Sequence, residues 1–83
     1  MTYKLAFKKS VDRDLKSIGT EQALRILERL ELELPFKADM FPMLSGKFSG
    51  LRKFRVGDYR VVFTIMGDTV LVLRIGHRRE VYR

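Results

Sequence analysis

The dipeptide Gly-Asp occurs twice in the second half of the chain, at residues 57–58 and 67–68. Each copy separates two runs rich in β-branched and aromatic residues, and Gly followed by Asp between such runs is typical of a two-residue hairpin with a type II′ turn. We therefore predict strands over residues 51–56, 59–66 and 69–75, joined as an antiparallel meander. The two-residue turns also fix the register, because the residues that flank each turn must pair.

The first half of the chain combines one alternating segment with two helical ones. Apolar and polar residues alternate over residues 3–7, which indicates a short strand. Apolar residues then recur at helical spacing on both sides of Gly19, which can end one helix. We expect Ser10 and Thr20 to cap the two helices and Pro35 to stop the second. Neither helix can bury its apolar stripe alone, so both must pack on the sheet.

These elements predict an α+β fold in a single domain over residues 1–83. It has an N-terminal strand and a two-helix hairpin packed on an antiparallel sheet whose last three strands form a meander. Residues 35–50 show no regular period and are expected to form a loop. Its apolar residues would pack under the sheet, or would contact a partner as the alternative.

The net charge of +7 is concentrated in one half of the sequence. Residues 43–83 hold nine basic and three acidic residues, which indicates an anionic partner, most simply a nucleic acid. The alternative is a charge that only keeps the protein soluble. Cysteine is absent, which excludes disulfides and suits a reducing cytosol. The first residues lack the apolar run of a signal peptide, so we expect a cytoplasmic protein.

The predicted register places two arginines face to face. If Val56 pairs with Tyr59, then Arg55 lies opposite Arg60, and strand alternation puts Lys53 on the same face. Like charges directly opposite each other destabilise a sheet. A phosphate bound between the two guanidinium groups would explain the pair, and two solvated arginines are the alternative.

Residues 76–83 add further cations, the one histidine and a tyrosine. An aromatic ring beside cations is a common way to hold an unstacked RNA base. The sequence contains no paired carboxylates on the basic strands and no metal-ligand cluster, so we expect neither a metal nor a cofactor. RNA can still be cleaved, because its own 2′-hydroxyl is the nucleophile. The protein then has to accept one proton, stabilise the phosphorane and protonate the leaving oxygen.

The candidate residues for that chemistry come from both basic segments. The catalytic candidates, with His77 and Arg78 as alternatives for the acid, are Lys53, Arg55, Arg60, His77, Arg78 and Tyr82. The candidates for binding substrate are Lys47, Arg52, Arg79 and Arg83.

The stretch LSGKFSGLRKFRVGDYRVVFTI, together with the closing IGHRREVYR, resembles the RelE/ParE toxin superfamily, and most of all its RelE-type mRNA interferases. The resemblance implies a toxin of a type II toxin–antitoxin system. Such a toxin would cleave mRNA in the ribosomal A site, inhibit translation and bind a cognate antitoxin. By motif position, Lys53 and Arg55 match the basic residues of the second strand and Arg60 matches that of the third. Arg78 matches the basic residue after the last strand, and Tyr82 the terminal tyrosine.

Two other functions stay open. ParE-like members of the superfamily inhibit DNA gyrase and generally lack this full basic set. A module that binds RNA without cutting it would use the same cations for phosphate affinity alone.

Overall fold

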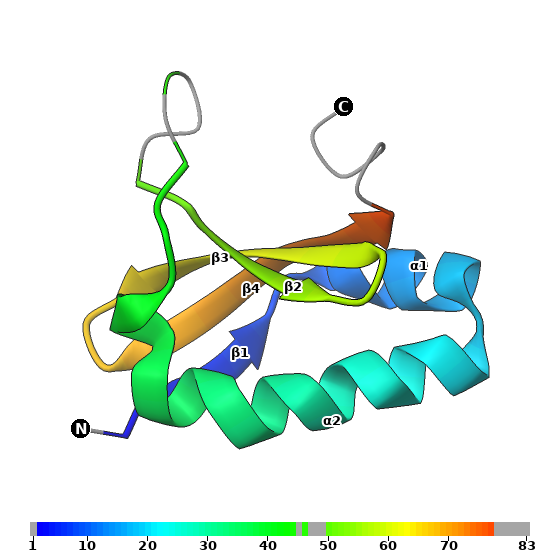
Figure 1. The fold of residues 1–83 in the computed structure, drawn as a ribbon, viewed down its shortest axis with the longest axis horizontal. Coiled ribbons are helices and arrows are strands. Elements are labelled where there is room, and N and C mark those ends of the chain that lie inside the picture. The colour runs from blue at the N-terminus through cyan, green and yellow to red at the C-terminus, as the bar shows by residue number, and fades with distance from the viewer. Residues whose placement is uncertain (1, 45, 47–49, 78–83) are drawn as a thin grey trace.

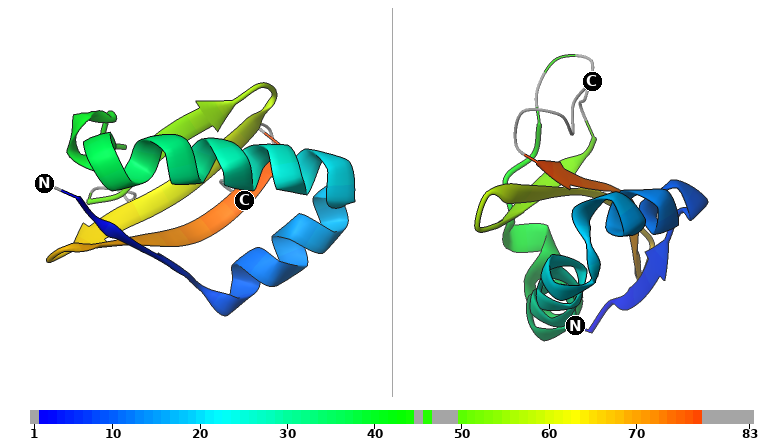
Figure 2. Two further views of the ribbon diagram at one scale, coloured as in Figure 1. Left: turned by 90° about the horizontal axis from the view of Figure 1, so that it is seen from below. Right: turned by 90° about the vertical axis from the view of Figure 1, so that its right-hand side faces the viewer.

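The computed structural model describes residues 2–44, 46 and 50–77, and over them the chain forms a sheet with two helices on one side of it (Figures 1 and 2). The elements, in chain order, are β1 (Lys4–Phe7), α1 (Lys9–Ile18), α2 (Thr20–Lys37), the 3-10 helix η1 (Ala38–Met40), β2 (Arg52–Val56), β3 (Tyr59–Met66) and β4 (Thr69–His77). The predicted α+β fold is confirmed.

The strand order is β1-β4-β3-β2, and the predicted meander is confirmed. Both hairpins have two-residue turns, because Val56 pairs with Tyr59 across the first and Met66 pairs with Thr69 across the second. The first turn residue is Gly57, whose φ of +58° is the left-handed value that a type II′ turn needs at this position. Strand β4 runs two residues beyond the predicted end, to His77.

Strand β1 makes the sheet mixed instead of fully antiparallel. It lies beside β4 in parallel orientation, with Lys4 opposite Thr69 and Phe7 opposite Val72. A parallel pair needs a long crossover connection, and here the helices and the first two strands of the meander supply it. The first and last strands of the described chain are therefore neighbours (Figure 1).

The prediction that Ser10 caps the first helix is wrong. Helix α1 begins two residues earlier than a Ser10 cap would allow, at Lys9, and its N-cap residue Lys8 makes no side-chain capping bond. The Ser10 hydroxyl instead donates to the carbonyl of Leu73 in β4, at 3.0 Å. The Ser10 hydroxyl therefore bonds to a distant strand and not to the backbone of its own helix.

The prediction that Pro35 stops the second helix is also wrong, because α2 continues to Lys37. Pro35 has no N–H and therefore removes one helical hydrogen bond near the end of α2. The Pro35 carbonyl accepts the backbone N–H of Tyr3 at 2.7 Å. The end of α1 at Gly19 is confirmed. Gly19 also takes the N-cap position of α2, which was predicted for Thr20.

The core lies between α2, α1 and the sheet. Its fully buried side chains are Val11, Ile26, Leu30, Leu34, Val61, Phe63, Val70, Val72 and Ile75. Phe41, from the segment after η1, packs edge-on against Phe54 with ring centroids 4.9 Å apart. This confirms the predicted packing of the loop for Phe41, whereas Met40 and Met43 are 77% and 55% exposed. In the part of the chain that the structure describes, neither helix has the length and apolar character to span a bilayer.

Candidate functional site

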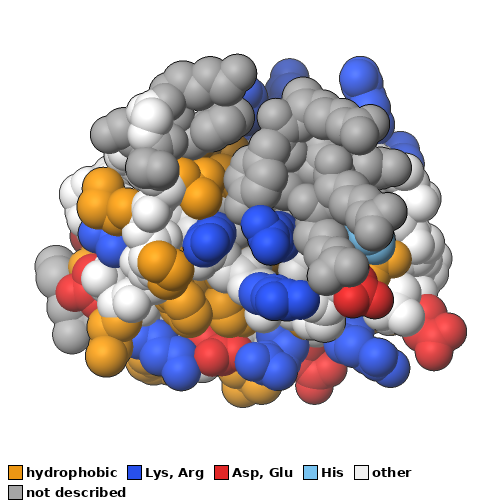
Figure 3. All heavy atoms as spheres, turned by 45° about the horizontal axis from the view of Figure 1, so that its top comes forward, with side chains coloured by type: hydrophobic (Ala, Val, Ile, Leu, Met, Phe, Trp, Pro, Cys, Tyr) orange, Lys and Arg blue, Asp and Glu red, His pale blue; other side chains and the backbone are white. Residues whose placement is uncertain are grey.

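The predicted facing of two arginines is confirmed: Arg55 in β2 lies opposite Arg60 in β3, and Lys53 lies opposite Val62. The neighbouring β2 residues Phe54 and Val56 point into the core, and both are buried. Strand alternation therefore turns Lys53 and Arg55 to the face away from the helices. Figure 3 shows Lys and Arg side chains gathered in the middle of the face turned to the viewer. We call Lys53, Arg55 and Arg60 the basic triad.

A groove of about 420 Å³ runs along the outer edge of β2, and the basic triad forms part of its lining. Its lining combines four basic side chains and one carboxylate with an aromatic floor, and it includes side chains from α2 and from the segment after η1. These residues are Arg29, Glu33, Phe41, Pro42, Lys53, Phe54, Arg55 and Arg60. The sequence analysis missed Arg29, Glu33 and Phe41. The only available signal was the i,i+4 spacing of Arg29 and Glu33, which is common on exposed helix faces.

Glu33 is held as an anion within this groove. Arg29 donates to its carboxylate through Nε at 2.8 Å and also through Nη2, and Lys37 Nζ lies 3.0 Å from the other oxygen. The hydrogen bond from Arg29, followed by that from Lys37, lowers the pKa of Glu33 below its ordinary value. The carboxylate in turn fixes the Arg29 guanidinium beside the groove.

Arg52, predicted to bind substrate, does not join the basic triad. Its guanidinium donates to the carbonyls of Phe41 at 2.7 Å and Asp39 at 3.2 Å. It therefore ties the end of η1 and the following segment to β2. These contacts give Arg52 a structural role in holding one wall of the groove.

His77 lies at the end of β4, opposite Tyr59 of β3, and their rings meet edge-on with centroids 6.1 Å apart. Cross-strand partners share a face, and Tyr59 packs against the core. The structure therefore places His77 on the helix side of the sheet and not with the basic triad. The other predicted residues, Lys47, Arg78, Arg79, Tyr82 and Arg83, lie outside the described residues.

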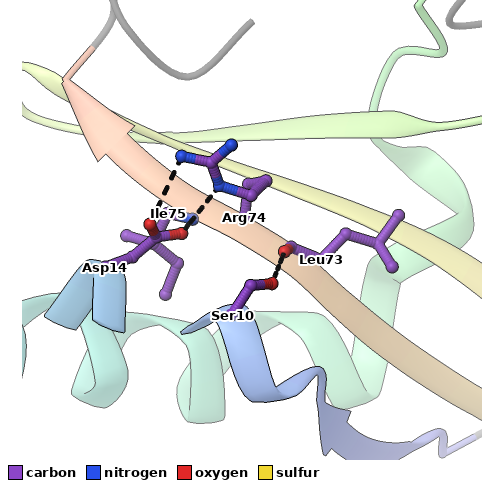
Figure 4. A network of polar contacts seen from close by, with 5 residues as sticks. All are labelled: Ser10, Asp14, Leu73, Arg74 and Ile75. Carbon is purple, nitrogen blue, oxygen red and sulfur yellow. Dashed lines mark hydrogen bonds and ion pairs between the residues drawn. The ribbon is translucent and has the colours of Figure 1, made fainter. Parts of the chain in front are cut away.

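Helix α1 holds the end of β4 where β1 no longer accompanies it (Figure 4). The Asp14 carboxylate accepts the backbone N–H of Ile75 at 2.9 Å and the Arg74 guanidinium at 3.0 and 3.3 Å. The β3–β4 register shifts here, since Val62 pairs with Arg74 but Phe63 pairs with Val72. Asp14 thus supports the irregular strand end that leads to residues 78–83.

The described residues contain no group of three or more His, Cys, Asp or Glu arranged to hold a metal ion. What the geometry offers is positive charge: three cations on a solvent-facing sheet surface, with an aromatic groove beside them. Such a surface can bind consecutive phosphates of a nucleic acid and position one of them.

Residues 5–82 match the model of a family described as the ParE toxin of type II toxin–antitoxin systems. No curated protein matches the sequence.

Solved structures with the same fold include members of several toxin–antitoxin systems. The RelBE2 toxin–antitoxin complex of Mycobacterium tuberculosis matches 94% of this chain and 100% of its own, at 25% identity and a TM-score of 0.85. The archaeal RelE–RelB complex of Pyrococcus horikoshii matches 96% of this chain and 99% of its own, at 27% identity and a TM-score of 0.72. The chromosomal ParDE system of P. aeruginosa shares the fold, at 21% identity over 92% of this chain and 96% of its own, with a TM-score of 0.71.

Proposed function

This chain belongs to the ParE toxin family of type II toxin–antitoxin systems, within the RelE/ParE superfamily, and we propose from its basic surface that it is an endoribonuclease that cleaves mRNA in the ribosomal A site. The observation that carries the proposal is the facing of Arg55 and Arg60 on the solvent side of the sheet, with Lys53 beside them. Two planar guanidinium groups that face each other can hold one phosphate through charge-assisted hydrogen bonds, and this arrangement supports a phosphate-binding site at the pair.

The proposed reaction needs no metal. Lys53 acts in its neutral form, and its amine accepts the proton of the RNA 2′-hydroxyl. The 2′-oxygen attacks the adjacent phosphorus, the bond from phosphorus to the 5′-oxygen breaks, and a 2′,3′-cyclic phosphate forms. Arg55 and Arg60 stabilise the negative charge that develops on the phosphate oxygens. His77 or Arg78 supplies a proton to the leaving oxygen, and Tyr82 stacks on a base. The placement of His77 on the other side of the sheet favours Arg78 for this role.

The test is tightly controlled expression followed by mapping of new mRNA 5′ ends on ribosomes. The unaltered protein should produce in-frame cuts while the DNA stays intact. Arg60→Ala should slow cleavage by about 10²–10³-fold, the usual effect of losing one donor that stabilises the transition state. The matched control is Arg13→Ala, which removes the same charge from an exposed position of α1 and should leave cleavage unchanged.

A second candidate function, inhibition of DNA gyrase, is favoured by the family description that matches residues 5–82. If the protein inhibits gyrase, its expression should break DNA and leave mRNA intact. No mRNA cleavage would then exist for Arg60→Ala to reduce. If the protein instead only bound RNA, Arg60→Ala would weaken binding and no cuts would occur in any context. Multiple-turnover cleavage by the unaltered protein on ribosomes excludes both alternatives.

We further propose a cognate antitoxin as the partner, because two of the similar structures are toxin–antitoxin complexes. The charge of the second half of the chain suits an acidic antitoxin segment over the basic triad. Binding should raise thermal stability, and its affinity should fall with added salt. An affinity that ignores salt would place the antitoxin on the helices and the apolar surface instead.

A further inference from the structure

We propose that the groove along the outer edge of β2 is a nucleotide subsite, which holds one base of single-stranded RNA against Phe41 and Pro42 and a neighbouring phosphate on the basic rim. The inference rests on the proposed ribonuclease function. It adds a base-binding element from a segment that the catalytic scheme does not use.

The groove has the size and the composition of a small-molecule site. Its volume of about 420 Å³ lies within the range of about 300–1,000 Å³ that is common for such sites. The apolar part of the lining comes from Phe41, Pro42 and Phe54, and charged side chains surround it. A nucleotide has the matching division into a flat apolar base and an anionic phosphate.

The Phe41 ring is fixed in place before any ligand binds. It packs edge-on against Phe54 at 4.9 Å and against Phe63 at 6.2 Å, and the carbonyl of Phe41 accepts a hydrogen bond from Arg52 at 2.7 Å. The part of Phe41 that is not buried lines the groove. A rigid ring loses little entropy on stacking, and each stacked base typically adds about 5- to 150-fold in affinity.

Cations stand on two sides of this floor. Lys53 and Arg55 come from the solvent-facing side of β2, and Arg29 comes from α2. The Arg29 guanidinium donates a hydrogen bond to the Glu33 carboxylate, which orients Arg29 before a ligand binds. A phosphate in the groove would be flanked by the sheet and by the helix, which extends the phosphate-binding surface around the edge of the sheet.

The other plausible occupant, an acidic antitoxin peptide, fits the groove less well. Peptides that bind an edge strand usually add a further strand to it. The segment after η1 already pairs with this edge, because Lys53 N–H donates to the Pro42 carbonyl at 3.1 Å and Leu44 N–H donates to the Leu51 carbonyl at 2.8 Å. That pairing occupies the backbone groups that an added strand would need along the first half of β2. A ligand in the groove would therefore be bound mainly by side chains, and an RNA base can be bound in this way.

The test compares two fluorescent RNA trinucleotides that carry the same phosphates, one intact and one with an abasic central position. Both are titrated against the full chain by fluorescence anisotropy at low salt. The unaltered protein should bind the intact trinucleotide about 5- to 150-fold more tightly than the abasic one. Phe41→Leu keeps apolar packing but removes the ring, so the ratio should fall toward one while the abasic affinity stays the same.

Two further variants separate the groove from general charge effects. Arg29→Gln should weaken both trinucleotides and lower the slope of log affinity against log salt by about one. Arg13→Ala, which removes a charge from α1 away from the groove, should change neither the ratio nor the affinity. A photo-crosslink from 4-thiouridine at the central position should fall on Phe41 or Pro42 in the unaltered protein, which tests the site even if Phe41→Leu does not fold.

The subsite would be overturned if the unaltered protein bound the intact and the abasic trinucleotide with nearly equal affinity. It would also be overturned if Phe41→Leu left the ratio of these affinities unchanged, or if the crosslinks fell only on other segments. Displacement of both trinucleotides by an acidic peptide, with no base dependence, would assign the groove to the antitoxin. Cleavage on ribosomes with a ratio near one would remove the subsite and keep the nuclease. A base-dependent ratio without cleavage would remove the nuclease and keep a nucleotide site.

Discussion

Replacing Asp14 with alanine removes the acceptor of three hydrogen bonds that tie α1 to the end of β4. Ile75 is 1% exposed, so its N–H loses its partner in a buried place, which costs about 1–3 kcal/mol. The Arg74 side chain is 42% exposed, and its ion pair contributes about 0–1 kcal/mol. The two effects together give a loss of about 2 kcal/mol, or about 8–16 °C in Tm for a domain of this size.

Asp14→Asn separates the two contributions. The asparagine oxygen can still accept the Ile75 N–H, but the charge and the second acceptor for Arg74 are lost. We therefore expect the free energy of unfolding to fall by about 1 kcal/mol or less, with an unchanged denaturant slope. Urea unfolding of the three proteins measures both values. A loss below about 0.5 kcal/mol for alanine, or equal losses for alanine and asparagine, would refute the assignment of the main effect to the backbone bond.

Hydrogen exchange gives the local counterpart of this measurement. The Ile75 amide should exchange faster in Asp14→Ala, because its acceptor is gone. The Val70 amide, in the part of β4 that has strands on both sides, should change only as far as global stability changes. Equal acceleration at both positions would mean that Asp14 acts on the whole fold and not on the strand end.

Arg55→Thr removes both the repulsion with Arg60 and the exposed hydrogen bond from the Arg55 Nε to the Gly57 carbonyl at 3.2 Å, so stability should change by no more than about 0.5 kcal/mol while the salt slope of RNA binding falls by about one; a loss above 1 kcal/mol in urea unfolding would contradict this. Glu33 has a pKa lowered chiefly by its hydrogen bond from Arg29, so its contribution is present above about pH 4.5 and is lost as the pH falls through the lowered value. Glu33→Gln should therefore cost about 0.5 kcal/mol in urea unfolding at pH 7, and this cost should shrink as the pH is lowered below about 4.5; a difference that does not change with pH would rule out the ion pairs as the cause. Tyr82→Phe should reduce single-turnover mRNA cleavage only mildly and Tyr82→Ala severely if the ring stacks on a base, whereas equal losses of about 10²-fold would assign proton transfer to the hydroxyl.

The meander could be predicted because its signals are local. Gly57 and Gly67 tolerate positive φ at the turn positions, and a two-residue turn leaves one possible pairing for the residues beside it. The facing of Arg55 and Arg60 followed from that pairing alone. For the same reason the basic triad could be assembled without knowledge of the helices.

The parts that were wrong or missing depend on distant segments. Ser10 has the chemistry of a helix cap, yet the Leu73 carbonyl in β4 takes its hydroxyl, and nothing near Ser10 in the sequence indicates this. His77 was named as a candidate acid from its place in the chain, and that role stays a prediction; strand alternation puts its ring beside Tyr59 on the helix side of the sheet. The groove could not be predicted, because its walls come from α2 and from the segment after η1. These two segments reach β2 only through tertiary packing.

The parallel pairing of β1 with β4 has a consequence for how the protein is made. During synthesis β1 leaves the ribosome before the other strands of the sheet, yet its neighbour is β4, which is made last among the described strands. At about 5–20 residues per second, β1 remains without its partner strand for several seconds. Contacts between such distant segments also slow the folding step itself. The basic triad therefore completes its supporting sheet only after β4 has been translated, which gives an antitoxin a period in which to meet the nascent toxin before it is competent to act.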